Sequence, residues 1–349
     1  MRSTRAYATS RPDAELAPVD IERRDLGSDD VAVHVTYCGV CHTDLHAIRA
    51  LPADGAPTPL VPGHEFVGTV TAAGADVTSV QVGDTVAVGN IVDSCGDCAM
   101  CLAGQENFCD NGVTLTYGGR IGHPDVITHG AFASEYVVRD RFVYRLPADV
   151  TDVAALAPVM CAGITVWEPL RRWRAGPGVR VGVVGLGGLG HLAVRLAHAL
   201  GAEVTAFTSS AAKQDEARRL GADHVVVSTD DDAMSAARNS CDLIIDCVPV
   251  EHDLAPYLNC VALDGTLCVV GHLGRVGVEI TQLLVGRKSL ASAGSGGVPA
   301  TRELLDFCLQ HDVRADIEVL PSAQVNTALA RLADGDVRYR FVLDLADLA

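Results

Sequence analysis

The fold is decided by the stretch Val179-Arg180-Val181-Gly182-Val183-Val184-Gly185-Leu186-Gly187-Gly188-Leu189-Gly190. Its first six residues are β-rich and predict a strand, and the glycines that follow have the spacing G-x-G-x-x-G. Apolar residues then recur at helical spacing, and Gly201 is placed to end the helix. A strand, a glycine-rich turn and an amphipathic helix together predict a dinucleotide-binding turn, in which the backbone approaches a pyrophosphate at the helix N-terminus.

The next strand, 203–207, bears on which dinucleotide binds. An NAD site usually ends this strand with an acid that hydrogen-bonds the adenosine ribose. Here the strand is followed by hydroxyls and an ammonium group, from Thr208, Ser209, Ser210 and Lys213. With no carboxylate to repel it, a 2′-phosphate can sit among these groups, so NADP(H) is favoured over NAD(H). Ser210 can also cap a helix that begins at Ala211, and the two roles are compatible.

Further strand-like runs complete an alternating β/α series, which is typical of a doubly wound parallel sheet of the Rossmann type. They lie at 225–227, 243–247 and 266–270. Short β-rich runs separated by glycine and aspartate occupy the first part of the chain instead. The sequence therefore predicts an α/β protein with a mostly-β domain and a Rossmann domain.

Reactive side chains are concentrated between Cys41 and His46, and a fold has no general need for that density. Downstream lie His64 and Cys161, so three separate segments offer two thiolates and one imidazole. Three protein ligands with a fourth position left open are what a catalytic zinc ion requires. The alternative is that each residue is a small buried cysteine or a hydrogen-bonded core histidine.

Four more cysteines follow the spacing Cys95-x2-Cys98-x2-Cys101-x7-Cys109. Four thiolates at these spacings suit a tetrahedral zinc ion with no open position, and hence a structural site. The alternative, four unrelated buried cysteines in one loop, explains the pattern less well. We expect a structural zinc lobe at 93–111.

The pattern Gly63-His64-Glu65-x2-Gly68-x5-Gly74-x2-Val77, with Cys-His-Thr-Asp-x-His upstream, resembles the zinc-dependent medium-chain alcohol dehydrogenases. Within them it resembles the cinnamyl alcohol dehydrogenase branch, over nearly the whole chain. The resemblance implies a GroES-like catalytic domain at 1–153 and 292–349 and a Rossmann coenzyme domain at 154–291. It places the active site in the cleft between them.

The resemblance also implies residue roles. It implies two zinc ions per chain, a catalytic one on Cys41, His64 and Cys161, which Glu65 approaches when substrate is absent, and a structural one on the four-cysteine lobe. Thr43 and His46 would relay a proton, and Asp44 would orient the imidazole of His64. The implied cofactor-binding residues are His42, Thr165, Gly185, Gly187, Gly188, Leu189, Gly190, Thr208, Ser209, Ser210, Lys213 and Arg338. Arg338 is equally well explained as a solvated charge.

The substrate pocket is expected to draw on the loop 110–130, with Thr114, Thr116 and Tyr117 as candidates, and on Ser295. Aromatic-specific relatives carry bulky pocket residues where this chain has Thr114 and the small run 294–297. This departure suggests a roomier or differently shaped pocket.

These observations favour a zinc-dependent alcohol dehydrogenase or aldehyde reductase that transfers hydride between NADP(H) and a primary alcohol or aldehyde, aromatic and allylic ones included. The alternatives are a C=N or C=C reductase of the same family and a non-catalytic zinc-binding module. A balance of 27 basic and 44 acidic residues, net −17, counts against nucleic acid or anionic membranes as partners. No apolar run approaches the ~20 residues that span a bilayer. We expect a cytoplasmic homodimer, the dimer by analogy alone.

Overall fold

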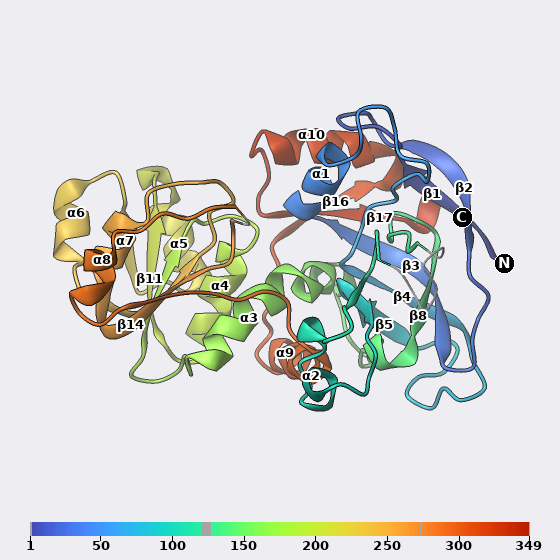
Figure 1. Cartoon of the computed structure of the whole chain (residues 1–349), viewed down its shortest axis with the longest axis horizontal. Helices are drawn as coiled ribbons and strands as arrows, with labels where there is room; N and C mark the ends of the chain where they lie inside the picture. Colours follow the sequence, from blue (N-terminus) through green and yellow to red (C-terminus); the bar gives the residue numbers. More distant parts are fainter. Residues whose placement is uncertain (1, 120–126, 273, 349) are drawn as a thin grey trace. The chain divides into compact units, whose positions relative to one another are not determined.

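The computed structural model describes residues 2–119, 127–272 and 274–348, and the chain divides into two compact units (Figure 1). The first unit comprises Met1–Cys161, Gly297–Arg302 and Ala315–Ala349. The second comprises Ala162–Gly296 and Glu303–Arg314. The first junction thus falls at 161/162, where the sequence placed it at 153/154, because the 3-10 helix Val153–Met160 packs on strands of the first unit.

The strands of the first unit form a seven-stranded sheet in the order β16-β17-β3-β4-β5-β9, with β8 also paired to β3. The neighbours are antiparallel except for the parallel pair β16–β17. Two smaller sheets, β1–β2 and β6–β7, complete the set. The bounds are β1 Arg2–Ala8, β2 Ala17–Arg23, β3 Asp30–Val40, β4 Phe66–Ala73, β5 Thr85–Val88, β6 Ile91–Asp93, β7 Thr114–Leu115, β8 Glu135–Arg139, β9 Tyr144–Arg145, β16 Ile317–Pro321 and β17 Arg340–Asp344.

Strand β3 is central to this sheet, since it pairs with β4, β8 and β17. Val31, Val33 and Val35 are fully buried and belong to one hydrophobic core, as the period of two in a strand requires. The strand ends at Val40, directly before Cys41. The sheet therefore holds the first residue of the reactive stretch in place.

The second unit contains six parallel strands in the order β12-β11-β10-β13-β14-β15. This is the doubly wound order in which strand succession reverses between β10 and β13. The predicted Rossmann-type sheet is confirmed. The bounds are β10 Arg180–Val184, β11 Glu203–Thr208, β12 His224–Val227, β13 Cys241–Asp246, β14 Val261–Val269 and β15 Ser289–Ser292.

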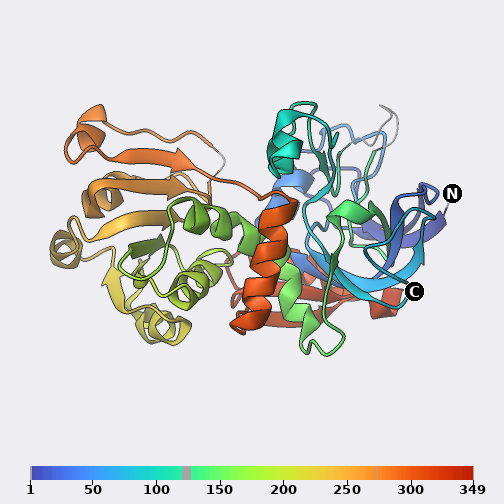
Figure 2. The ribbon, with the colours of Figure 1, turned by 90° about the horizontal axis from the view of Figure 1, so that it is seen from below.

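Helices lie on both sides of the second sheet, α4 and α5 on one side and α7 and α8 on the other (Figures 1 and 2). The α-helices are α1 His42–Arg49, α2 Ala99–Leu102, α3 Ala162–Arg172, α4 Gly190–Ala199, α5 Gln214–Leu220, α6 Asp231–Ala236, α7 Ala255–Cys260, α8 Ile280–Leu284, α9 Val298–Gln310 and α10 Val325–Ala333. The 3-10 helices are Glu106–Phe108, Asp140–Phe142, Val153–Met160, Ala211–Lys213, Ser322–Gln324 and Ala346–Leu348.

Within the residues described, no single helix has the length and apolar character needed to cross a membrane. The 3-10 helix Val153–Met160 and α3 meet that test only as a pair, which is bent by 59°.

The predicted glycine-rich turn joins β10 to α4, and two of its glycines are required by the backbone. Gly185 has φ of +86°, in the left-handed region that glycine adopts at little cost. A Cβ atom on Gly190 would lie 1.8 Å from the carbonyl oxygen of Gly185, so only glycine lets α4 begin this close to the turn. A Cβ atom on Gly187 would meet nothing within 4 Å.

Replacing Gly190 and Gly187 separately tests this division of roles. We expect Gly190→Ala to lower the free energy of unfolding by about 1–3 kcal/mol, the usual cost of overpacking. Gly187→Ala should leave stability within about 0.5 kcal/mol and weaken NADPH binding instead, because its methyl group occupies open space beside the turn. Urea unfolding of both variants measures the difference, and equal stability of the two would contradict the packing argument.

Candidate functional site

Three ligand atoms converge in the first unit. The Sγ atoms of Cys41 and Cys161 and an imidazole nitrogen of His64 all lie within 4.8 Å of one another, and all three residues are buried. His64 Nε2 is 3.3 Å from Cys161 Sγ. Zinc bonds of about 2.0–2.3 Å in a tetrahedron place nitrogen and sulfur about 3.6 Å apart. These three residues, called the trio below, therefore fit a zinc ion with one position left for another group.

The carboxylate of Asp44 organises the trio. Its Oδ1 accepts hydrogen bonds from the Gly63 amide and from His64 Nδ1, both at 3.0 Å, and its Oδ2 accepts from the Cys41 amide at 2.9 Å. Because Nδ1 donates to Asp44, Nε2 is the nitrogen left to face the thiols. Burial disfavours the charged imidazole, but the neighbouring Asp44 carboxylate outweighs it and raises the pKa of His64 well above its ordinary value.

Local sequence explains how the trio is assembled. Helix α1 begins at His42, and Asp44 in its first turn accepts the Cys41 amide that the helix leaves unpaired. Gly63 has φ of +94°, and a Cβ atom there would lie 2.6 Å from the ring of Phe132. The glycine before His64 is therefore required by both backbone and packing.

A buried ion pair lies next to the trio. Glu65 Oε1 bonds Arg340 Nη2, and both side chains are almost completely buried. Burial raises the pKa of Glu65 to about 7, although Arg340 opposes the shift. The hydrogen bond with Cys161 lowers the pKa of the Cys41 thiol well below its ordinary value, and Arg340 and His64 also favour its thiolate. Glu65 thus binds an arginine here, and its expected approach to zinc stays a prediction.

Arg340 was not predicted from the sequence, in which Arg338 was the expected functional arginine. Both belong to the first unit, two residues apart, but Arg340 opens β17 and is 2% exposed. An arginine at the start of a strand that is buried on both faces, directly before Phe341 and Val342, was the available signal.

Helix α1 presents the expected relay residues. Thr43 and His46 are exposed and three residues apart, so they share one side of the helix, while Asp44 is buried. Thr43 Oγ1 lies 3.7 Å from Cys41 Sγ, which places its hydroxyl at the edge of the trio. His42 is half-buried, and burial followed by the charges of Arg340 and His46 lowers its pKa.

The four cysteines of the predicted lobe form the second cluster, and their ligand atoms also lie within 4.8 Å of one another. Neighbouring sulfurs are separated by 3.8 Å (Cys95 to Cys101), 3.4 Å (Cys95 to Cys109) and 4.0 Å (Cys98 to Cys109). Zinc–sulfur bonds of about 2.3 Å in a tetrahedron give about 3.8 Å between sulfurs. Backbone amides of Cys101 and then Asp110 lower the pKa of Cys98 to about 7, so its thiolate is favoured. The cluster fits a closed, structural zinc site.

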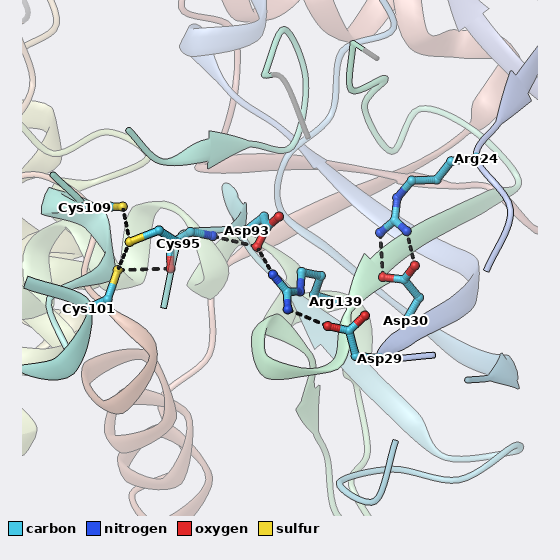
Figure 3. Close-up of polar contacts among 9 residues, drawn as sticks. Arg24, Asp29, Asp30, Asp93, Cys95, Cys101, Cys109 and Arg139 are labelled. Carbon is cyan, nitrogen blue, oxygen red and sulfur yellow. Dashed lines mark hydrogen bonds and ion pairs between the residues drawn. The ribbon is translucent and has the colours of Figure 1, made fainter. Parts of the chain in front are cut away.

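Ion pairs connect the lobe to the rest of the first unit. Glu106 in the lobe is 1% exposed, pairs with Arg141 and accepts the Val298 amide at 2.9 Å. Arg139 on β8 bridges Asp93, the first residue of the lobe, and Asp29, beside the start of β3 (Figure 3). These contacts brace the loop at a distance from the trio's own hydrogen bonds.

The second unit has a cavity of about 240 Å³ at the carboxyl ends of β10, β11 and β13, where doubly wound sheets bind nucleotides. Its lining residues are Val184, Gly185, Leu186, Gly187, Phe207, Thr208, Ser209, Lys213, Ser228, Cys247, Val248, Pro249 and Tyr257. The glycine-rich turn and three of the four residues expected at the 2′-phosphate thus line one cavity.

The fourth residue, Ser210, flanks the 3-10 helix Ala211–Lys213, but its side chain makes no capping hydrogen bond. The side chain of Ser210 therefore does not cap this helix, as the sequence had suggested it could. Lys213 Nζ donates to the Leu186 carbonyl at 3.4 Å, which holds the ammonium group over the turn. Gly188 and Leu189 belong to the same turn, and Thr165 lies on α3.

The expected pocket residues are divided between the units. Thr114, Thr116 and Tyr117 belong to the first and Ser295 to the second. Part of the 110–130 loop, residues 120–126, lies outside the described residues. Two glycines of the small run are explained by packing: a Cβ atom on Gly296 would lie 2.7 Å from Ile164, and one on Gly297 would lie 2.1 Å from the Gly104 carbonyl oxygen. The small size of Gly296 and Gly297 is therefore explained by packing and is no evidence for a larger substrate pocket.

Comparison with known proteins identifies the family of this chain. Residues 27–148 match the alcohol dehydrogenase GroES-like domain, and residues 188–310 match the zinc-binding dehydrogenase domain. The chain is 45% identical to the aldehyde reductase YahK of Escherichia coli over 346 residues, 99% of this chain and 98% of that one. It is 43% identical to NADP-dependent alcohol dehydrogenase C 1 of Mycolicibacterium smegmatis, covering 100% and 99% of the two chains.

The chain is also similar to solved structures of cinnamyl alcohol dehydrogenases. A cinnamyl alcohol dehydrogenase from Sorghum bicolor superposes with a TM-score of 0.93 at 42% identity, covering 99% of this chain and 98% of that one. The cinnamyl alcohol dehydrogenase of Helicobacter pylori, determined with NADP(H), gives 0.89 at 29% identity, with 98% of each chain covered. With a GroES-like unit, a Rossmann unit and two cysteine-rich metal sites, this is an oxidoreductase fold. The chain belongs to the zinc-dependent medium-chain alcohol dehydrogenases, as the sequence motifs predicted.

The lobe cysteines can be tested separately from the trio. We expect Cys109→Ser to reduce zinc from two ions per chain to one and to lower the melting temperature by about 5 °C or more, because a closed zinc site contributes directly to folding. Cys308→Ala removes a buried thiol elsewhere and should retain both ions. Elemental analysis with calorimetry measures both, and two zinc ions in Cys109→Ser would exclude the lobe site.

Proposed function

We propose that the enzyme reduces aldehydes to primary alcohols with NADPH, and that the trio is its catalytic metal site. The observation that carries this is the trio itself: three buried ligands and an exposed hydroxyl, Thr43, at its edge. Two relatives that match nearly the whole chain are an aldehyde reductase and an NADP-dependent alcohol dehydrogenase.

The cofactors and the chain supply different parts of the reaction. When bound, zinc on the trio supplies a Lewis acid for a carbonyl group, and NADPH supplies the hydride. Cys41, His64 and Cys161 hold the metal, while Asp44 fixes the tautomer and tilt of the imidazole. Thr43 donates a hydrogen bond to the substrate oxygen and passes it a proton as the alcohol forms, and His46, on the same side of α1, resupplies that proton from solvent.

The preference for NADPH follows from charge at the end of β11. Thr208 occupies the position of the ribose-binding acid, and no carboxylate lines the described cavity. Ser209 and Lys213 line this cavity. The Ser210 hydroxyl is available to a ligand because it does not cap the helix that follows. Two hydroxyls and one ammonium group suit a 2′-phosphate.

A carboxylate placed at this position tests the preference. We expect Ser210→Asp to lower kcat/KM for NADPH about tenfold or more, since like charges a few ångströms apart repel by at least about 1 kcal/mol, with little effect on NADH. Ser210→Ala removes the hydroxyl without adding charge and should cost only a few-fold. Steady-state rates with aliphatic and aromatic aldehydes measure this and identify the substrate class. Oxidation of neither cofactor by any aldehyde, with two zinc ions bound, would favour a C=N or C=C reductase.

The relay is tested at Thr43. We expect Thr43→Val to lower kcat about 100-fold, within the usual range for a lost proton-transfer group. Zinc content and the Kd for NADPH should be unchanged, because Thr43 is exposed and holds neither ligand. Single-turnover kinetics with fluorescence titration of NADPH separates the two effects. An unaltered rate of hydride transfer would remove Thr43 from the mechanism.

We further propose a homodimer formed through the edge strand β15. This strand ends the six-stranded sheet, and apolar side chains of the preceding segment are more than 40% exposed: Val276, Ile280, Leu284 and Val285. An unpaired edge beside such side chains favours strand pairing with a second copy. Light scattering should give twice the chain mass for the wild type and a monomer for Ile280→Asp with Leu284→Asp; a monomeric wild type would contradict the proposal.

A cytoplasmic location is supported by the twelve cysteines, none of which forms a disulfide bond.

A further inference from the structure

Tyr117 contacts the trio through its ring. The tyrosine and the imidazole of His64 meet edge to face, with ring centroids 5.6 Å apart and an angle of 74° between the planes. This is a favoured geometry for two aromatic rings. The contact restricts rotation of the imidazole about its own side-chain bonds.

The hydroxyl of Tyr117 is buried, and no atom of the described chain completes a hydrogen bond with it. The charges of Asp44, Cys41 and Cys161 nevertheless act on this side chain. A tyrosine is a neutral phenol at pH 7, and its hydroxyl can donate one hydrogen bond. A donor without a partner therefore lies among acceptors.

Asp44 retains capacity for one more donor. Among the described residues, its Oδ1 accepts from Gly63 and His64, and its Oδ2 accepts from Cys41 alone. A carboxylate offers about four lone-pair sites, two on each oxygen. Oδ2 can accept the phenol without releasing any existing bond.

The backbone on both sides of the tyrosine is fixed by hydrogen bonds. Thr116 Oγ1 donates to the Gly89 carbonyl at 2.6 Å, and the Tyr136 hydroxyl donates to the Thr116 carbonyl at 2.7 Å. On the other side, the Gly118 amide donates to the Thr128 carbonyl at 3.0 Å. The segment is thus held by side chains as well as by backbone, as a positioning role requires.

We propose that Tyr117 is a positioning residue for the metal-ligating imidazole, whose tilt is fixed by the tyrosine ring edge while the hydroxyl donates to Oδ2 of Asp44. This inference rests on the proposed function, since it requires a metal ion on the trio. It gives Tyr117 a role different from lining the substrate pocket, which the sequence suggested.

The test measures metal binding rather than turnover. The Kd of the trio for zinc is determined in chelator-buffered zinc, and the trio's ion is identified by its loss in Cys41→Ser. We expect Tyr117→Phe to raise this Kd about tenfold, the low end for lost partners of metal-binding histidines, and Tyr117→Leu to raise it further. Tyr144→Phe removes another buried phenol of the first unit, near Thr301, and should leave the Kd unchanged. In cobalt-substituted protein, the visible absorption bands should shift in both Tyr117 variants and not in Tyr144→Phe.

A double-mutant cycle decides whether the hydroxyl acts through Asp44. We expect Tyr117→Phe to have little further effect on zinc affinity in an Asp44→Asn background, because both changes remove the same hydrogen bond. Full additivity, or a wild-type Kd and cobalt spectrum for Tyr117→Phe, would overturn the inference while leaving the proposed function intact. A wild-type protein without any Cys41-dependent zinc would instead refute the proposed function.

Discussion

The metal-binding part of this enzyme depends on one buried carboxylate. Asp44 accepts three hydrogen bonds, from the Cys41 amide, the Gly63 amide and His64 Nδ1, and so joins the end of β3, the turn before β4 and the imidazole. Hydrogen bonds to a charged group each contribute about 1.5–3 kcal/mol, and their loss would leave buried donors unpaired. Two members of the trio, Cys41 and His64, are therefore held by an acceptor that no member of the trio can replace.

Different constraints govern the other sites. The lobe is held by four sulfurs and by the ion pairs of Glu106 and Arg139, so its folding and the assembly of the trio use separate interactions. In the second unit the limiting contact is steric: Gly190 must lack a side chain for α4 to begin beside Gly185. Selectivity for the cofactor is electrostatic and arises from the absence of an acid at Thr208 among the residues that line the described cavity.

Much of this was predictable because the relevant signals are local in the sequence. Three motifs each lie within one short segment: the glycine turn, the four-cysteine spacing and the Cys-His-Thr-Asp stretch. The two-unit fold and the family were predicted from them. Apart from the trio, whose residues the motifs marked, contacts between distant segments were not predicted. Arg340 meets Glu65 across 275 positions, and the ring of Tyr117 turns toward His64. Capping by Ser210 was a reasonable expectation from residue type, yet Thr208 Oγ1, within the same turn, is the group that accepts the Ser210 amide.

The most direct test of the account is the zinc content of an Asp44→Ala variant, measured by elemental analysis on folded, purified protein. If Asp44 assembles the trio, zinc should fall from two ions per chain to one, with the remaining ion on the four-cysteine lobe and the fold retained by circular dichroism. Two tightly bound zinc ions in Asp44→Ala would show that the trio holds its geometry without the carboxylate, and would contradict the account.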